Sequence, residues 1–388
     1  MPAIAGFRGA LWDPTKVELA KVVASPVSGV KDRLASGELV RDPVRAVYRY
    51  HQVFSDSGRT ITRQNVIVAA RLTPWSEGQI RPHEATDPTA RDAAAASIAA
   101  AGAHTEPVFA GYRDSAREVD RLFRRAESEP PTIEVTTPDR TIHRLWRVAS
   151  AEIIGKLRPL FAPKRMHVLD GHARYEGMLA YAEKIGAEDA PQYSSAKYGL
   201  VCISNLDEPT FVIAARHRLV RSDGFKRDAV LDAAKKYFIV DKLAGLAGDA
   251  AKLEREVIET TAHQPTFVTV FAGDADAWKL TLKSDVSPVG EGIDVHRAIQ
   301  KYDPVVVESL FLRRVLQTAA ATTDVDAASV VSAVKAGASI GMIMRPMTLD
   351  QIVHTDEVGA VLPFGSTAFQ PPLANLVTYV VDLDEDVV

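Results

Sequence analysis

Leu169-Asp170-Gly171-His172-Ala173-Arg174-Tyr175-Glu176 is the stretch from which the fold of this chain can be worked out. Residues 166–169, which lead up to Asp170, are mostly apolar and predict a short strand. After it, apolar side chains recur at helical spacing from residue 175 to residue 185, and this period predicts a helix. The stretch is therefore expected to be the turn between a strand and a helix.

The beginning of that helix is a candidate anion site. The first N–H groups of a helix have no intrahelical partner and carry partial positive charge. Gly171 would let the backbone approach a ligand closely, and His172 and Arg174 would add donors beside it. This combination suits a phosphate or a carboxylate. The alternative is an ordinary helix start, with Asp170 in a glycine turn and the charges solvated.

Three other polar clusters lie at the ends of predicted strands or in loops. His83 and Glu84 follow the strand predicted at residues 65–72 and could form an acid/base pair or position a metal, or they could be solvated loop residues. Arg216-His217-Arg218 could hold an anion or be an exposed basic strand end. Gly365-Ser366-Thr367 offers donors for phosphate, but is equally a plain turn.

The order of the elements predicts the fold class. Predicted strands and helices are interspersed without the regular alternation of a doubly wound parallel sheet, which favours an α+β fold with mixed sheets and packed helices. No P-loop, dinucleotide fingerprint, zinc-protease helix or nucleophile elbow occurs in the chain. A length of 388 residues exceeds what one core usually supports. We therefore expect two α+β regions, 1–222 and 223–388, with the second contributing to the same site as the first.

Composition excludes several classes of protein. The chain has 46 Lys+Arg and 50 Asp+Glu, a formal net charge of −4, which makes nucleic acid an improbable partner. No apolar run is long enough for a membrane span, and no secretory signal is recognisable, so a cytoplasmic location is expected. The single cysteine, Cys202, lies in an apolar strand pattern and is expected to be buried and inert. The expected partner is a small anionic ligand, and no signal indicates a particular oligomeric state.

Taken in order, these clusters resemble the family catalogued as domain of unknown function 1015. Further segments carry the resemblance: Glu106-Pro107-Val108-Phe109-Ala110-Gly111-Tyr112, His143-Arg144-Leu145-Trp146, His217-Arg218-Leu219 and Leu362-Pro363-Phe364-Gly365-Ser366-Thr367. The similarity spans residues 5–380. The Asp-Gly-His-x-Arg stretch also resembles the phosphate-binding motif of the ParB/sulfiredoxin-like superfamily, which includes chromosome-partitioning nucleotide-binding proteins and free-serine kinases.

This resemblance implies a ParB/sulfiredoxin-like core and a phosphoryl transfer from ATP or ADP to a small hydroxyl metabolite, such as a serine-like amino acid. Magnesium would offset the phosphate charge, with no dedicated protein metal site. By resemblance the catalytic residues are Glu84, Asp170 and His172, with Asp170 or Glu84 accepting the hydroxyl proton. The implied ligand- or phosphate-binding residues are His83, Gly171, Arg174, His217, Arg218, Ser366 and Thr367.

The chain departs from the family pattern within two of these motifs. Ala173 stands where the family usually has a second histidine, and Gly365 stands where it has a lysine, a point charge well suited to phosphate. These departures leave two alternatives open. One is a regulatory protein that binds a nucleotide or phosphorylated ligand without turnover. The other is a hydrolase that uses Glu84 and His83.

Overall fold

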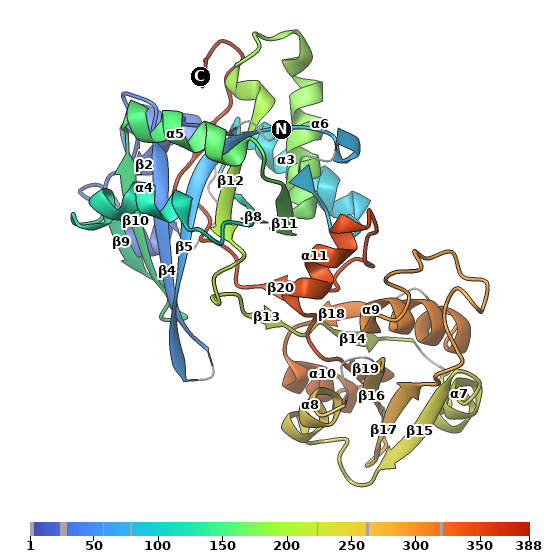
Figure 1. Cartoon of the computed structure of the whole chain (residues 1–388). Helices are drawn as coiled ribbons and strands as arrows, with labels where there is room; N and C mark the ends of the chain where they lie inside the picture. The colour runs from blue at the N-terminus through green and yellow to red at the C-terminus, as the bar shows by residue number, and fades with distance from the viewer. Residues whose placement is uncertain are drawn as a thin grey trace. The chain divides into compact units, whose positions relative to one another are not determined.

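The structure is a computed structural model that describes residues 4–23, 29–56, 58–77, 80–222, 224–260, 264–318 and 321–388. Helices and mixed sheets alternate along the chain (Figure 1), so the predicted α+β class is confirmed. The chain forms two compact units. Unit 1 comprises Met1–Pro82, Thr86–Val212 and Gln370–Val388, and unit 2 comprises His83–Ala85 and Ile213–Phe369. The sequence suggested one boundary near residue 222, whereas three residues of the N-terminal half belong to unit 2 and the last nineteen belong to unit 1.

Unit 1 contains a long series of strands and helices. Its elements are β1 (Ile4–Ala5), β2 (Ala10–Trp12), α1 (Leu19–Val22), α2 (Val30–Ser36), β3 (Leu39–Arg41), β4 (Val47–Asp56), β5 (Arg59–Arg71), the 3-10 turn η1 (Trp75–Glu77), β6 (Ile80–Arg81), α3 (Pro88–Ala101), β7 (Ala103–His104), β8 (Val108–Tyr112), α4 (Glu118–Glu127), β9 (Ile133–Thr136), β10 (Ile142–Val148), α5 (Ala151–Phe161), β11 (Met166–Asp170), α6 (His172–Lys184), the 3-10 turns η2 (Ala187–Asp189) and η3 (Ser195–Lys197), β12 (Tyr198–Asn205) and β21 (Tyr379–Val380).

The main sheet of unit 1 is mixed. Its strand order is β6-β11-β8-β12-β5-β4-β10-β9, with β1 also paired to β5. The β6–β11 and β8–β12 pairs are parallel and the other pairs are antiparallel. Strand β12 is buried along its whole length, as expected for an apolar strand covered on both faces. Cys202 on this strand is buried as predicted, and burial raises the pKa of its thiol to about 12.

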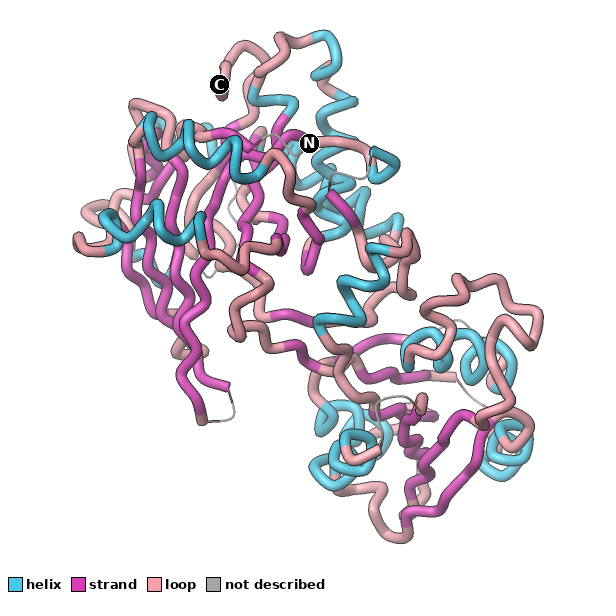
Figure 2. The backbone as a smooth tube through the Cα atoms, viewed as in Figure 1, coloured by secondary structure: helices cyan, strands magenta, loops and turns pink. Residues whose placement is uncertain are grey.

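Strand β4 is the clearest element that the sequence did not predict. It pairs with β5 in a long hairpin, which Figure 2 shows as two adjacent strands of unit 1. Polar residues in β4 interrupt the alternation of apolar side chains by which a strand is usually predicted. Arg49 is fully buried, and its guanidinium contacts Asp120 at 3.0 Å and Glu127 at 2.6 Å. A buried arginine is tolerated when carboxylates pair with it, so β4 can be buried at four successive residues, Val47–Tyr50, without an apolar sequence pattern.

Unit 2 has its own set of elements. They are β13 (Ile213–Ala214), β14 (His217–Val220), α7 (Arg227–Ala234), β15 (Phe238–Leu243), α8 (Ala250–Ile258), β16 (Thr266–Phe271), β17 (Ala277–Leu282), α9 (Asp303–Val306), the π-helix η4 (Val307–Val315), β18 (Thr322–Asp324), α10 (Ala327–Lys335), β19 (Ile340–Ile343), α11 (Leu349–Glu357) and β20 (Ala368–Phe369).

The sheet of unit 2 is antiparallel and has helices on both faces. The strand order is β15-β17-β16-β19-β14-β18. Along β16, Phe267 and Phe271 pack into a core with α7 and η4, while Val268 and Val270 pack into a second core with α8 and α10. Figure 1 shows these helices beside the sheet of unit 2. Burial on both faces explains why β16 has apolar side chains on both faces and no alternation with exposed polar residues.

No helix in the described parts of the chain combines the length and the apolar character that crossing a bilayer requires.

Three buried histidines predict how stability depends on pH. Burial lowers the pKa of His104 to about 3, and of His143 and His217 to about 4. An unfolded histidine has a pKa of about 6.5. The unfolded chain therefore binds more protons than the folded chain below that pH, and stability falls as pH decreases from about 6.5 towards 4.

We expect each of these histidines to remove about 1 kcal/mol per pH unit in this range. The measurement is the free energy of unfolding in urea between pH values of about 7.5 and 5. The His217→Asn variant retains an acceptor for the Met344 N–H, which now donates to Nδ1 at 3.0 Å, and should show a shallower pH dependence than wild type. The exposed His354 provides the control, His354→Gln. Equal pH slopes for His217→Asn and His354→Gln would contradict the assignment.

Candidate functional site

The predicted strand–turn–helix is present in unit 1. Strand β11 ends at Asp170, Gly171 forms the turn, and α6 begins at His172, so this prediction is confirmed. Gly171 has φ 91°, and no side chain makes a capping hydrogen bond at the beginning of α6. A φ in this region favours glycine. The beginning of the helix thus retains the donor character that the sequence predicted.

Gly171 also leaves room for the Arg174 side chain, which packs against it. A Cβ atom at this position would lie 2.8 Å from Nε of Arg174. The close approach places the guanidinium directly over the turn. The glycine therefore serves both the backbone conformation and the position of Arg174.

Arg174 lies between two carboxylates. Its Nη1 is 2.8 Å from Oε2 of Glu106, and its Nη2 contacts the carboxylate of Asp170. The side chains of Asp170 and Glu106 are 39% and 45% exposed, so solvent screens both pairs and each contributes little to stability. Nε of Arg174, in contrast, is buried and has no hydrogen-bond partner. The arginine is thus oriented by two acids that can be displaced, and one of its donors remains unused.

A small cavity adjoins this arginine. It has a volume of about 170 Å³ and is lined by α3, the segment after it and α6. The polar side chains on its wall are Ser97, Thr105, Glu106 and Arg174. Two hydroxyls, a carboxylate and a guanidinium are therefore available to a group of a few atoms beside the beginning of α6.

The next residues of the motif hold the structure behind the turn. Glu176 accepts hydrogen bonds from Nε1 of Trp75 at 2.7 Å and from Oγ1 of Thr86 at 2.8 Å. Trp75 stacks on Tyr175 with ring centroids 4.3 Å apart. The Tyr-Glu pair of the motif therefore fixes the loop after β5 against α6 and has a structural role.

In unit 2, Glu84 binds the C-terminal Gly-Ser-Thr loop. Its Oε2 accepts from the N–H of Gly365 at 3.0 Å, and its Oε1 accepts from the N–H of Thr367 at 2.6 Å and from the Thr367 hydroxyl. Nε2 of His83 lies 2.8 Å from the same hydroxyl. Both His83 and Glu84 are buried. The donors that the sequence offered to phosphate are therefore used here by a carboxylate of the chain itself.

The two arginines of the Arg-His-Arg cluster bond to carbonyl groups of that loop. Nη1 of Arg218 donates to Gly365 O at 2.8 Å, and Nε of Arg216 donates to Thr367 O at 3.0 Å. Arg218 is 2% exposed, and its Nη2 has no hydrogen-bond partner. Burial lowers the pKa of Arg218, although an arginine keeps its charge near neutral pH.

The contacts of His217 indicate a structural role. It is fully buried, and its Nδ1 accepts from the N–H of Met344 at 3.0 Å. The ring is therefore neutral at pH 7, in agreement with its lowered pKa of about 4. Its Nε2 lies 3.8 Å from Oε1 of Glu254 and makes no hydrogen bond.

Apart from His217, the predicted site residues thus form one cluster in each unit. Unit 1 holds Asp170, Gly171, His172 and Arg174. Unit 2 brings together a second set around one loop: His83, Glu84, Arg218, Ser366 and Thr367. The described residues contain no group of three or more His, Cys, Asp or Glu side chains that could hold a metal ion.

Sequence reasoning did not select Glu106 as a site residue. It lies just before β8, a strand that the sequence did predict, and it meets Arg174 across 68 positions of the chain. Two signals were available: its position just before an apolar strand, and its place in the segment 106–112 that carries the family resemblance. Only the pairing of β8 with β11 brings it to Arg174.

With this geometry established, comparison with known proteins identifies the family. A family model described as a protein of unknown function (DUF1015) matches residues 14–310, which is more than half of the chain. The chain belongs to the DUF1015 family. The resemblance inferred from the sequence motifs is therefore confirmed, and no curated protein matches this DUF1015 chain.

Several solved structures resemble this DUF1015 protein at low identity. A variant free serine kinase in complex with ADP has 13% identity and a TM-score of 0.42, covering 82% of this chain and 92% of that one. SbnI with a C-terminal truncation, from Staphylococcus aureus, has 15% identity and a TM-score of 0.41, covering 83% and 91%. A conserved hypothetical protein from Pyrococcus furiosus has 12% identity and a TM-score of 0.40, covering 82% and 95%.

The turn before α6 predicts a specific effect of Gly171→Ala. An alanine would be strained at φ 91° and would also displace Arg174. Gly186 provides a matched control, because it has φ 72° and no atom lies within 4 Å of its Cβ position. We expect Gly171→Ala to lose about 1 kcal/mol more stability than Gly186→Ala in urea unfolding. Combination with Arg174→Ala should remove the difference; equal losses for the two single variants would show that Arg174 does not constrain the turn.

The Glu84 contacts predict that this carboxylate stabilises unit 2. Glu84→Ala would leave the N–H groups of Gly365 and Thr367 without their present acceptor. Each buried unsatisfied donor costs about 1–3 kcal/mol, so a loss of about 3 kcal/mol is expected. Glu84→Gln keeps one acceptor oxygen and should lose less. The exposed Glu357 of α11 supplies the control Glu357→Ala, and a Glu84→Ala loss as small as that of the control would contradict this role.

Proposed function

We propose that this protein is a nucleotide-dependent phosphotransferase that acts on a small hydroxyl metabolite such as a serine-like amino acid. The observation that supports the proposal is the beginning of α6, which has no side-chain cap and lies beside an arginine with a buried, unused Nε donor. The N–H groups at a helix start and a guanidinium are the donors that phosphate groups need. The Asp-Gly-His-x-Arg motif at this position resembles a phosphate-binding motif.

The roles of the residues follow from their positions. Gly171 lets the backbone approach the phosphates, and Arg174 stabilises their charge, with His172 as a further donor at the first position of the helix. Asp170 is 39% exposed and is the carboxylate that would accept the hydroxyl proton. On binding, a phosphate would replace one of the carboxylates that now pair with Arg174, because such partly exposed pairs are weak.

Magnesium fits this arrangement as a companion of the nucleotide. Magnesium is commonly bound by one or two carboxylates together with substrate phosphates, and Asp170 and Glu106 are the carboxylates beside Arg174. Bound there, the ion would neutralise charge on the transferred phosphoryl group.

A second candidate function is the binding of a nucleotide or phosphorylated ligand without turnover. The observation in its favour is that Glu84, one of the two predicted proton acceptors, uses its carboxylate oxygens to bind the Gly365 and Thr367 backbone. The same contacts give no support to a hydrolase that uses Glu84 and His83. Position 365 has φ 67°, a conformation that favours glycine over the lysine usual in the family.

The proposal predicts that nucleotide binding depends on Arg174. Arg174→Met keeps the length of the side chain and removes its donors, and we expect it to weaken ADP or ATP binding at least about tenfold, because hydrogen bonds to charged groups are worth roughly 1.5–3 kcal/mol. The measurement is calorimetric titration with magnesium present. Arg121→Gln, on the exposed face of α4, is the matched control and should bind as wild type does.

Turnover is tested separately from binding. Wild-type protein is incubated with ATP or ADP, magnesium and a panel of hydroxy-amino acids, and phosphomonoester products are sought by phosphorus NMR. A product that Asp170→Asn fails to form supports the phosphotransferase. Nucleotide binding without any product leaves the binding protein, and the absence of nucleotide binding removes both. Binding that is unchanged in Arg174→Met overturns the placement of the nucleotide at α6.

A further inference from the structure

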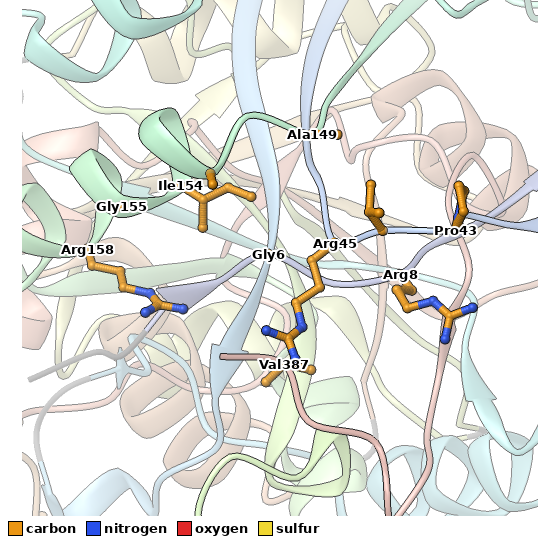
Figure 3. Close-up of a pocket in the computed structure, with 11 residues that line it drawn as sticks. Gly6, Arg8, Pro43, Arg45, Ala149, Ile154, Gly155, Arg158 and Val387 are labelled. Carbon is orange, nitrogen blue, oxygen red and sulfur yellow. The ribbon is translucent and has the colours of Figure 1, made fainter.

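Unit 1 carries a second pocket, which shares no lining residue with the cavity beside α6. Its volume is about 690 Å³, within the usual range for small-molecule sites. Its wall is formed by residues 6 and 8, residues 43–45, one face of α5 from Ala151 to Arg158 with the preceding Ala149, and Val387. Figure 3 shows Ile154 and Arg158 extending from α5 on one side and Arg45 from another segment.

Three arginines line this pocket, and two of them have no carboxylate partner. Arg8 donates to the carbonyl of Asp42 at 2.9 Å and lies 3.9 Å from Glu385. Arg45 donates from Nε to the carbonyl of Asp386 at 3.0 Å and forms no ion pair within the described residues. Arg158 is exposed, and its guanidinium has neither a hydrogen bond nor an ion pair with any described residue, although it interacts electrostatically with the Tyr198 hydroxyl. Unpaired guanidinium groups on a pocket wall suit a carboxylate or phosphate.

Apolar side chains lie among these charges. Val44 is 51% exposed, Ile154 is partly buried and Val387 is buried. An exposed valine beside two uncompensated arginines does not suit a purely ionic ligand. A ligand with an anionic head and a short apolar portion would cover Val44 and Ile154 and satisfy Arg45 and Arg158 together.

The glycine at position 155 is a second, independent indication. It lies inside α5 and on the pocket wall, and no atom lies within 4 Å of its Cβ position. Glycine destabilises a helix interior relative to alanine, yet nothing is packed here that would exclude a side chain. Gly6 differs, because its Cβ would lie 2.9 Å from Ile154. At position 155 the glycine keeps the pocket open.

We infer that this pocket binds a small amphipathic organic anion, whose head group is bound by Arg45 and Arg158 and whose apolar portion lies against Val44 and Ile154. The site is separate from the one proposed to bind phosphates at α6, because the two share no lining residue. The head group is a carboxylate or a phosphate ester, and the choice between them is made by the experiment.

The test uses the full chain and four probes: hexanoate, hexyl phosphate, 1-hexanol and acetate. We expect hexanoate or hexyl phosphate to raise the melting temperature and to give a saturable calorimetric isotherm, whereas 1-hexanol and acetate lack one half of the ligand and should bind far more weakly. Arg158→Gln should weaken binding of the anionic probe about tenfold or more. Arg121→Gln is the matched control.

Gly155→Leu tests the pocket by placing a side chain in the space that the ligand would occupy. Leucine is a good helix former, so this variant should melt at a higher temperature than wild type without ligand, while its binding of the anionic probe is lost. Arg174→Met should bind the probe as wild type does, which separates this site from the proposed nucleotide site. The inference is overturned if no anionic probe binds, or if Arg158→Gln binds the probe with wild-type affinity. Should Gly155→Leu fail to fold, Arg158→Gln alone decides.

Discussion

The carboxylate of Glu84 is the constraint on which the polar cluster of unit 2 depends. It is buried, and a buried charge is tolerated only when hydrogen bonds replace its hydration. Here the backbone N–H groups of Gly365 and Thr367 provide those bonds, across 281 and 283 positions of sequence. Because the carboxylate fixes this loop, the loop's carbonyl groups are in position to accept hydrogen bonds from Arg216 and Arg218.

The cluster at α6 is organised in the opposite way. In unit 2 an internal anion binds backbone donors and is shielded from solvent. At α6 a cation, Arg174, lies between two carboxylates that are each more than a third exposed. Such pairs are screened and exchangeable, while the donors of the helix start remain uncapped. This difference supports the proposal of an external anion at α6 and the stabilising role expected of Glu84.

The sequence predicted those features that depend on local pattern. The strand–turn–helix at Asp170-Gly171-His172 and the buried strand around Cys202 follow from period and turn chemistry, and both are present. Strand β4 was missed because Arg49 is buried by acids from α4, which no local pattern indicates. The partner of Glu84 was equally hidden, since a motif shows which groups can bond and only the fold shows which of them meet.

Glycine occurs in this chain for different physical reasons at different positions. Gly171 and Gly365 both have positive φ, and both lie beside a side chain that a Cβ atom would touch, Arg174 in one case and Thr323 in the other. Gly155 has neither reason, being helical and without neighbours at its Cβ position. A helix that accepts glycine where a larger residue would fit gives up intrinsic stability. Because nothing in the surrounding fold requires this, the requirement is best sought in what occupies the adjoining pocket, where Arg158 on the same helix extends without a hydrogen bond or ion pair to any described residue.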